Sequence, residues 1–179
     1  PPGDRGGRRS RRTRSIYRPA VLPYVTTPLS GDRTAPTVRR AERMDLLAVH
    51  RIEQASFSEP WPYAAFETFL DTPGFLVGDG GGVVGFVVAN MLADSALQVG
   101  QVKDLAVAPG SRSQGIGGRL LDRAIAVLSN QGATAIKLEV RESNDPARSL
   151  YESRGFEHRR TAASYYADGE DALVLVRAA

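Results

Sequence analysis

The chain contains no cysteine, and this absence removes several kinds of chemistry at once. Disulfide bonds, zinc sites with cysteine ligands and cysteine nucleophiles are all excluded. Histidine is also scarce, because His50 and His158 are the only two and cannot complete a zinc site by themselves. We therefore expect no metal in the site.

Long apolar runs are absent too. No run approaches the roughly 18 residues that span a bilayer, and no apolar signal-peptide core lies near the start. We therefore expect a cytoplasmic protein without a membrane partner. A chain of 179 residues suits one domain with a sizeable core, and a second full domain would be cramped.

Acidic residues are rare in residues 1–36, where eight arginines accompany two aspartates for a net charge of +6. The rest of the chain holds 15 basic and 18 acidic residues. We expect residues 1–36 to be a disordered tail and residues 37–179 to form the folded domain. The arginines are typical of a segment that binds nucleic acid, and the alternative is that the tail has no role. A non-AUG start at Val25 would place residues 1–24 outside the natural protein.

Apolar periodicity and turn residues predict an α/β layered domain with a mixed sheet, in the order β-α-α-β-β-β-α-β-α-β-β. The turn residues at 79–82 predict an antiparallel hairpin. The first predicted helix has apolar residues at roughly helical spacing, namely Leu46, Leu47, Val49, Ile52 and Phe57.

The most informative stretch is VAPGSRSQGIGGRLL at 107–121, in which a glycine-rich loop lies between a predicted strand and an apolar helix. Such loops bind phosphate, because unpaired N–H groups and the helix dipole converge there. Ile116 and Gly117 stand where a P-loop needs Lys and Ser or Thr. Leu120 replaces the third glycine of a dinucleotide-binding fingerprint. Both nucleotide-binding interpretations are therefore disfavoured, and the pattern Arg112-x-x-Gly115-x-Gly117 is left.

This pattern resembles the acetyl-coenzyme A motif of the GCN5-related N-acetyltransferases (GNAT). KLEVRESNDPARSLYESRGFE, FSEPWPYAAF and SYYADGEDALVL resemble the family's RimI-like branch, the ribosomal-protein alanine N-acetyltransferases, so the resemblance covers about residues 37–177. It implies a single GNAT-like domain with a mostly antiparallel sheet and helices on both faces. It also implies acetyl-coenzyme A as cosubstrate and protein N-termini, including those of ribosomal proteins, as acceptors.

The resemblance further implies how the coenzyme is held. Backbone N–H groups of 113–118 would bind the pyrophosphate, and the strand at 105–107 would pair with the pantetheine arm. The full implied set is Leu105, Ala106, Val107, Arg112, Ser113, Gln114, Gly115, Ile116, Gly117, Gly118 and Asn144. The missing side chains at 115, 117 and 118 would let a ligand approach the backbone. The alternatives are an ordinary tight turn and, for Arg112, a solvated loop charge.

The strand at 136–141 carries a sharper signal. Its period of two places Lys137, Glu139 and Arg141 on one face, and three charges on one face of a strand inside a sheet require water or a cleft. By the resemblance, Glu139 is the general base, acting directly or through water. The alternative is a surface glutamate paired with Lys137 or Arg141.

The next helix is predicted to have Asp145 as its N-cap and Pro146 at its first position. Spacing places Tyr151 on the side that faces the sheet. The resemblance makes Tyr151 the general acid that reprotonates the coenzyme thiolate, and the alternative is plain core packing. Trp61, Tyr165 and Tyr166 resemble the family's peptide-binding elements, with core packing and a hairpin face as their alternatives.

The reaction implied is direct attack of a free amine on the thioester, without an acyl-enzyme. With reference pKa values of about 8 for an α-amine and about 10.4 for lysine, deprotonation at pH 7 costs roughly 1.4 and 4.6 kcal/mol. An N-terminus is the easier acceptor for a modest base. Two alternatives are kept: a lysine or small-amine acetyltransferase on the same scaffold, and a non-catalytic module that senses the coenzyme or binds RNA.

Overall fold

A computed structural model gives the structure of residues 35–93 and 97–179. Residues 1–34, which make up nearly all of the predicted basic tail, lie outside the described residues. The elements are β1 Thr37–Arg40, η1 Arg43–Asp45, α1 Leu46–Ser56, α2 Tyr63–Glu67, β2 Gly74–Asp79, β3 Val83–Met91, β4 Val99–Val107, η2 Pro109–Ser111, α3 Ile116–Asn130, β5 Ala135–Arg141, α4 Asp145–Glu152, β6 Glu157–Ala162 and β7 Ala172–Ala178. Apart from two short 3-10 turns, this is the predicted order, so the α/β fold is confirmed.

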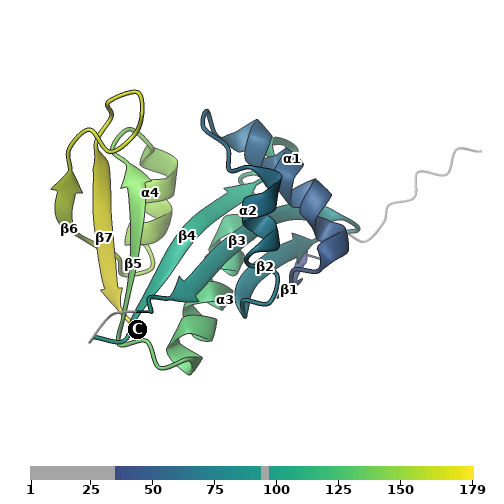
Figure 1. The fold of residues 1–179 in the computed structure, drawn as a ribbon, viewed down its shortest axis with the longest axis horizontal. Helices are drawn as coiled ribbons and strands as arrows, with labels where there is room; N and C mark the ends of the chain where they lie inside the picture. Colours follow the sequence, from purple (N-terminus) through teal and green to yellow (C-terminus); the bar gives the residue numbers. More distant parts are fainter. Residues whose placement is uncertain (1–34, 94–96) are drawn as a thin grey trace, which may run out of the picture. The chain divides into compact units, whose positions relative to one another are not determined.

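The strands form one mixed sheet in the order β1-β2-β3-β4-β5-β7-β6 (Figure 1). Every neighbouring pair is antiparallel except β4 and β5, which are parallel. The final strand β7 pairs with both β5 and β6. The parallel pair therefore lies between two antiparallel halves of the sheet.

Helices cover both faces of the sheet and create two cores (Figure 1). Alternation along β2 sends Phe75 and Val77 toward α1 and α2, and Leu76 toward α3. The first core is centred on Phe66 of α2, and Tyr151 of α4 belongs to the second. In the part of the chain that the structure describes, no helix is both long and apolar enough to cross a membrane.

The apolar residues at helical spacing in the first helix are not all buried. Leu47 is 54% exposed, whereas Glu53 is 1% exposed. The buried face of α1 follows three- and four-residue steps from Leu46 through Val49 to Glu53, and Leu47 lies off that line. The sequence thus places a carboxyl group on the helix face that packs against the sheet.

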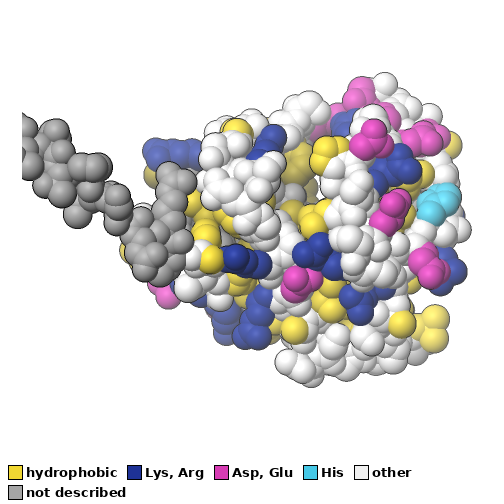
Figure 2. Space-filling view, turned by 180° about the vertical axis from the view of Figure 1, so that it is seen from behind, with side chains coloured by type: hydrophobic (Ala, Val, Ile, Leu, Met, Phe, Trp, Pro, Cys, Tyr) yellow, Lys and Arg dark blue, Asp and Glu magenta, His cyan; other side chains and the backbone are white. Residues whose placement is uncertain are grey.

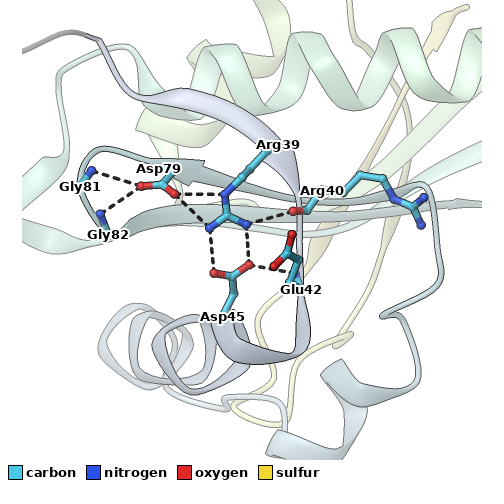
Figure 3. A network of polar contacts seen from close by, with 7 residues as sticks. All are labelled: Arg39, Arg40, Glu42, Asp45, Asp79, Gly81 and Gly82. Carbon is cyan, nitrogen blue, oxygen red and sulfur yellow. Dashed lines mark hydrogen bonds and ion pairs between the residues drawn. The ribbon is translucent and has the colours of Figure 1, made fainter.

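An arginine-centred network fixes the first strand (Figure 3). Arg39 of β1 donates to both carboxylate oxygens of Asp45, at 2.7 and 2.9 Å, and to Asp79 at 3.0 Å. Asp79 also accepts hydrogen bonds from the backbone N–H groups of Gly81 and Gly82 in the β2–β3 turn. Arg39 therefore joins β1, the start of α1 and the predicted hairpin turn.

The surface of the domain differs in charge from the tail. Residues 37–179 carry more acidic than basic residues. Seen from behind, acidic and basic side chains are interspersed over the domain (Figure 2). The positive charge of the whole chain therefore comes from residues 1–36.

Candidate active site

The site is formed where β4 and β5 separate. The two strands pair only from Val99↔Ala135 to Gln101↔Lys137, although β4 continues to Val107 and β5 to Arg141. Beyond this point a cavity of about 430 Å³ opens between them, and α1, the segment after it, α4 and the β6–β7 loop complete its walls. The cleft predicted from the charged face of β5 is present.

Glu139 lies just beyond the last paired residues, on the cavity wall. Its Oε1 is 3.1 Å from Nζ of Lys137, and its Oε2 accepts a hydrogen bond from Nε2 of Gln101 at 2.9 Å. The side chain is 15% exposed. Both carboxylate oxygens of Glu139 therefore have a partner, and one of these partners is the cation Lys137. Glu139 lies in the predicted cleft, and it also pairs with Lys137, as the alternative interpretation expected.

Tyr151 forms another part of the wall. It is 8% exposed, its ring packs against Phe156 at 6.0 Å, and it also lines the cavity. Burial, with a further contribution from the nearby carboxyl of Asp104, raises the pKa of the Tyr151 hydroxyl well above its ordinary value. The hydroxyl therefore keeps its proton at neutral pH.

The predicted phosphate loop lies at the start of α3. Ser113 and Gly115 adopt positive φ values of 61° and 75°, and Gly115 is the residue before the helix. The first hydrogen bond of the helix runs from the N–H group of Arg119 to the carbonyl of Gly115. The N–H groups of residues 116–118 therefore lie in the first turn, where backbone donors have no partner within the helix. This arrangement suits an anion at the helix N-terminus.

One expectation for this loop needs correction, and the alternative kept for Arg112 is disfavoured. The space that a Gly118 side chain would fill is occupied by the guanidinium of Arg154, so the missing side chain there serves packing and not ligand approach. Arg112 donates to the Val107 carbonyl at 3.1 Å and to Ser56 Oγ at 3.3 Å. It connects the loop to the end of α1 and is more than a solvated charge.

Asn144 lies on the cavity wall and also begins α4. Its Oδ1 accepts a hydrogen bond from the N–H of Ala147 at 3.2 Å. The helix begins at Asp145, so Asn144 is the N-cap and the prediction of Asp145 as the cap is wrong. Either residue type can cap a helix, and the sequence alone did not distinguish them.

The predicted peptide-binding aromatics are separated by the structure. Trp61 and Tyr166 line the cavity, whereas Tyr165 is 56% exposed and lies outside its wall. Trp61 also stacks on Phe69, with ring centres 5.8 Å apart, so it has a packing role as well. Burial raises the pKa of Tyr166, so its hydroxyl is a hydrogen-bond donor at neutral pH.

Sequence reasoning missed a pair of carboxyl groups on the cavity wall, Glu53 of α1 and Asp104 of β4. Glu53 Oε1 accepts a hydrogen bond from the backbone N–H of Trp61 at 2.8 Å. Burial, the charge of Glu53 and a hydrogen bond with it raise the pKa of Asp104 to about 8, and burial raises the pKa of Glu53 too. The one available signal was the position of Glu53 on the apolar face of α1.

The splayed parallel strands, the free helix N-terminus beside them and the cavity with ionisable residues between them match the acyl-coenzyme A site that the resemblance to acetyltransferases implies. The sequence profile of the Acetyltransferase (GNAT) family matches residues 46–156. The chain belongs to this family.

Individual relatives support the assignment. The chain is 33% identical over 147 residues to the [ribosomal protein bS18]-alanine N-acetyltransferase of Escherichia coli K12, covering 78% of this chain and 95% of that one. It is 32% identical over 153 residues to the N-alpha-acetyltransferase of Saccharolobus solfataricus, and the match covers 79% of this chain and 92% of that one. The crystal structure of Ard1 from Thermoplasma volcanium superposes with a TM-score of 0.74 at 28% identity, covering 81% and 98%. The resemblance to the GNAT family and its RimI-like branch is confirmed.

Proposed function

We propose that the protein is an acetyl-coenzyme A dependent N-α-acetyltransferase that transfers acetyl directly to the free N-terminal amine of proteins, ribosomal proteins among them. The observation that carries this proposal is the cavity between the separated halves of β4 and β5. Relatives named for ribosomal-protein alanine and for N-terminal amines, at 30% identity or more, support the acceptor class.

The coenzyme would lie along the free edge of β4 and end at α3. Among the described residues, no strand pairs with the β5-facing edge of β4 after Gln101, so backbone groups of 105–107 are available to a pantetheine arm. The N–H groups at 115–118 and the helix dipole favour the pyrophosphate. Arg112 positions this loop by its bond to Val107. The remaining members of the implied set are Ser113 and Gln114, which are exposed in the loop, and Asn144, which lies on the cavity wall.

The acid–base roles follow from the two cavity residues. Glu139 accepts a proton from the attacking nitrogen, either directly or through a water molecule. Tyr151, kept protonated by burial, gives its proton to the departing thiolate. The oxyanion that forms when the amine attacks the thioester, before the thiolate leaves, is stabilised by a backbone N–H group of the free β4 edge.

The acceptor peptide enters between the two aromatic walls. Trp61, stacked on Phe69, forms one wall, and Tyr166, under the Arg141 guanidinium, forms the other. Tyr165 packs edge-on against Tyr166, with ring centres 5.1 Å apart, and supports it from outside the cavity. This geometry suits an extended chain end with a small first side chain.

The test is release of coenzyme A thiol from acetyl-coenzyme A with short peptides that start with Ala, Ser or Met. Each peptide is paired with an α-acetylated copy that contains lysine, and wild type is compared with Glu139→Gln. We expect release only with free N-termini and at least about a hundredfold lower rate in the variant. Turnover of the blocked lysine peptides would show the lysine or small-amine activity instead. Coenzyme binding without turnover of either peptide would reject the enzyme proposal.

A further inference from the structure

The carboxyl groups of Glu53 and Asp104 have no assigned role in the reaction described above, although both lie on the cavity wall. Glu53 Oε2 and Asp104 Oδ2 are each buried and have no hydrogen-bond donor among the described residues. Glu53 itself is 1% exposed. A buried polar atom left without a partner costs free energy, so these oxygens need a donor, either a proton shared within the pair or a group that enters the cavity.

The two carboxyl groups can hydrogen-bond to each other only when one holds a proton. Desolvation and the neighbouring charge both disfavour two ionised carboxylates at this place. At neutral pH the pair therefore holds one proton and one negative charge.

No cation of the cavity wall neutralises this charge among the residues that the structure describes. Arg141 pairs with Glu59, Asp168 and Glu170, as its ion pairs show. Lys103 donates to Gln101 at 3.3 Å. Lys137 pairs with Glu139. Among the described wall residues, no cation pairs with Glu53 or Asp104, and a charge on His50 of α1 also acts on Glu53.

Glu139 is less suited to receive a cation. Both of its oxygens already accept hydrogen bonds, and the ammonium of Lys137 at 3.1 Å repels a second positive group. Within the same cavity, Glu53 and Asp104 each have a buried acceptor oxygen without a donor among the described residues.

We propose that the Glu53–Asp104 pair binds the α-ammonium of the acceptor's first residue and takes its first proton. This inference rests on the proposed function. A terminal ammonium carries three N–H donors, enough for both free oxygens and one further acceptor. Such a group satisfies the two unpartnered atoms and neutralises the pair at once.

The proton balance is simple. The ammonium gives one proton to the carboxylate of the pair, the amine lone pair forms the C–N bond to the acetyl carbon, and the C–S bond breaks. The nitrogen then loses its second proton to Glu139, and the thiolate gains one from Tyr151. Transfer of the Glu139 proton to Tyr151, directly or through water, restores both residues. The proton on the pair leaves to solvent through the open cavity. An α-amine has a reference pKa of about 8 and therefore gives up its proton more readily than lysine, at about 10.4.

The test measures the contribution of the ammonium to binding. A tetrapeptide that starts with Ala and its des-amino copy, which starts with a propanoyl group, are titrated calorimetrically into the protein with coenzyme A present at pH 7. For wild type we expect the amino peptide to bind at least about tenfold more tightly, as a charge-assisted hydrogen bond provides. For the double variant Glu53→Gln, Asp104→Asn we expect a difference below about twofold.

The single variants refine the result. Asp104→Asn leaves the Glu53 carboxylate charged and bonded to an amide donor, so it keeps most of the preference for the ammonium. Asp45→Asn is the matched control, because Asp45 is also buried, at 5% exposure, but does not line the cavity. It must keep the wild-type preference even if it lowers stability.

The outcomes are separable from those of the proposed function. Coenzyme A affinity and thermal unfolding of each variant show whether it is folded. If the double variant does not fold, Glu53→Gln with Asp104→Ser provides a smaller neutral pair on the wall of an open cavity. A folded, neutral variant that still prefers the amino peptide tenfold overturns the inference while wild-type turnover stands. Absence of wild-type turnover would overturn the proposed function itself.

Discussion

The guanidinium carbon of Arg141 lies 3.8 Å from the centre of the Tyr166 ring. The same guanidinium donates to Asp168 at 2.8 Å and Glu170 at 2.7 Å, and it lies 3.8 Å from Glu59. These contacts connect β5 with the β6–β7 loop and with the segment that follows α1. Arg141 therefore positions the Tyr166 wall of the cavity.

This relationship makes Arg141→Lys informative, because lysine keeps the charge but lacks the planar fork and the stacking surface. We expect the KM for peptide to rise about tenfold, the equivalent of roughly 1.4 kcal/mol. The KM for acetyl-coenzyme A should change less than about twofold, since the loop at α3 is untouched. Steady-state kinetics with each substrate varied in turn makes the measurement. Arg159→Lys, at an exposed arginine of β6, is the control, and an unchanged peptide KM in Arg141→Lys would contradict the positioning role.

Tyr151→Phe separates an acid from a core residue. The variant keeps the ring that packs on Phe156 and loses only the hydroxyl, so the fold should be preserved. We expect kcat to fall about a hundredfold, because the thiolate leaves without a proton donor, and both KM values to stay within about twofold. Full activity in Tyr151→Phe would show that Tyr151 serves packing alone.

Gly115→Ala tests the helix start as the coenzyme site. Gly115 has φ of 75°, and an added Cβ would meet no atom within 4 Å, so strain comes from the backbone alone. Gly110 has the same open space without a positive φ, which makes Gly110→Ala a matched control. We expect Gly115→Ala to raise the KM for acetyl-coenzyme A about tenfold and to cost about 1 kcal/mol of stability, while Gly110→Ala stays near wild type. Equal effects of the two substitutions would argue against this loop as the coenzyme site.

The sequence predicted those parts of the site that follow local periodicity. The period of two in β5 was enough to place Glu139 beside an opening, and three- and four-residue spacing placed Tyr151 against the sheet. Glu53 and Asp104 could not be paired in this way, because they lie on different elements and meet only through the packing of α1 on β4. The same holds for Gly118, whose missing side chain accommodates Arg154 from the turn that follows α4.

Arg39→Met probes the network that fixes β1. The substitution leaves Asp45, which is 5% exposed, without its bidentate partner, and we expect a loss of about 2 kcal/mol at pH 7. Arg39 lowers the pKa of Asp45, so this stabilisation is complete above the ordinary aspartate value of 3.8 and disappears as the pH falls through the folded-state value. Denaturant unfolding at pH 7 and pH 3 should therefore show wild type and variant converging in acid. A gap that stays constant would assign the loss to packing and not to the ion pair.

The pH dependence of stability gives an independent view of Asp104. Its pKa is raised from 3.8 to about 8, so the folded protein holds a proton that the unfolded chain has lost between these values. A raised folded-state pKa contributes stability that is complete below pH 4 and is lost as the pH rises toward 8. Within the pair, Glu53 raises the pKa of Asp104. His50 of α1 acts on Glu53, and Tyr151 of α4 interacts with Asp104.

Asp104→Asn cannot titrate and should escape this loss. We expect the difference between its thermal midpoint and that of wild type to increase as the pH goes from 4 to 8. A stability difference of 1 kcal/mol corresponds to about 2–4 °C in a domain of this size, so the difference is measurable. Asp45→Asn is the contrast, because the pKa of Asp45 is lowered and its effect should diminish toward acid. Parallel curves for wild type and Asp104→Asn between pH 4 and 8 would mean that the two carboxyl groups do not share a proton. The pair would then carry two charges at neutral pH, which the burial of Glu53 makes costly unless a cation stays bound between them.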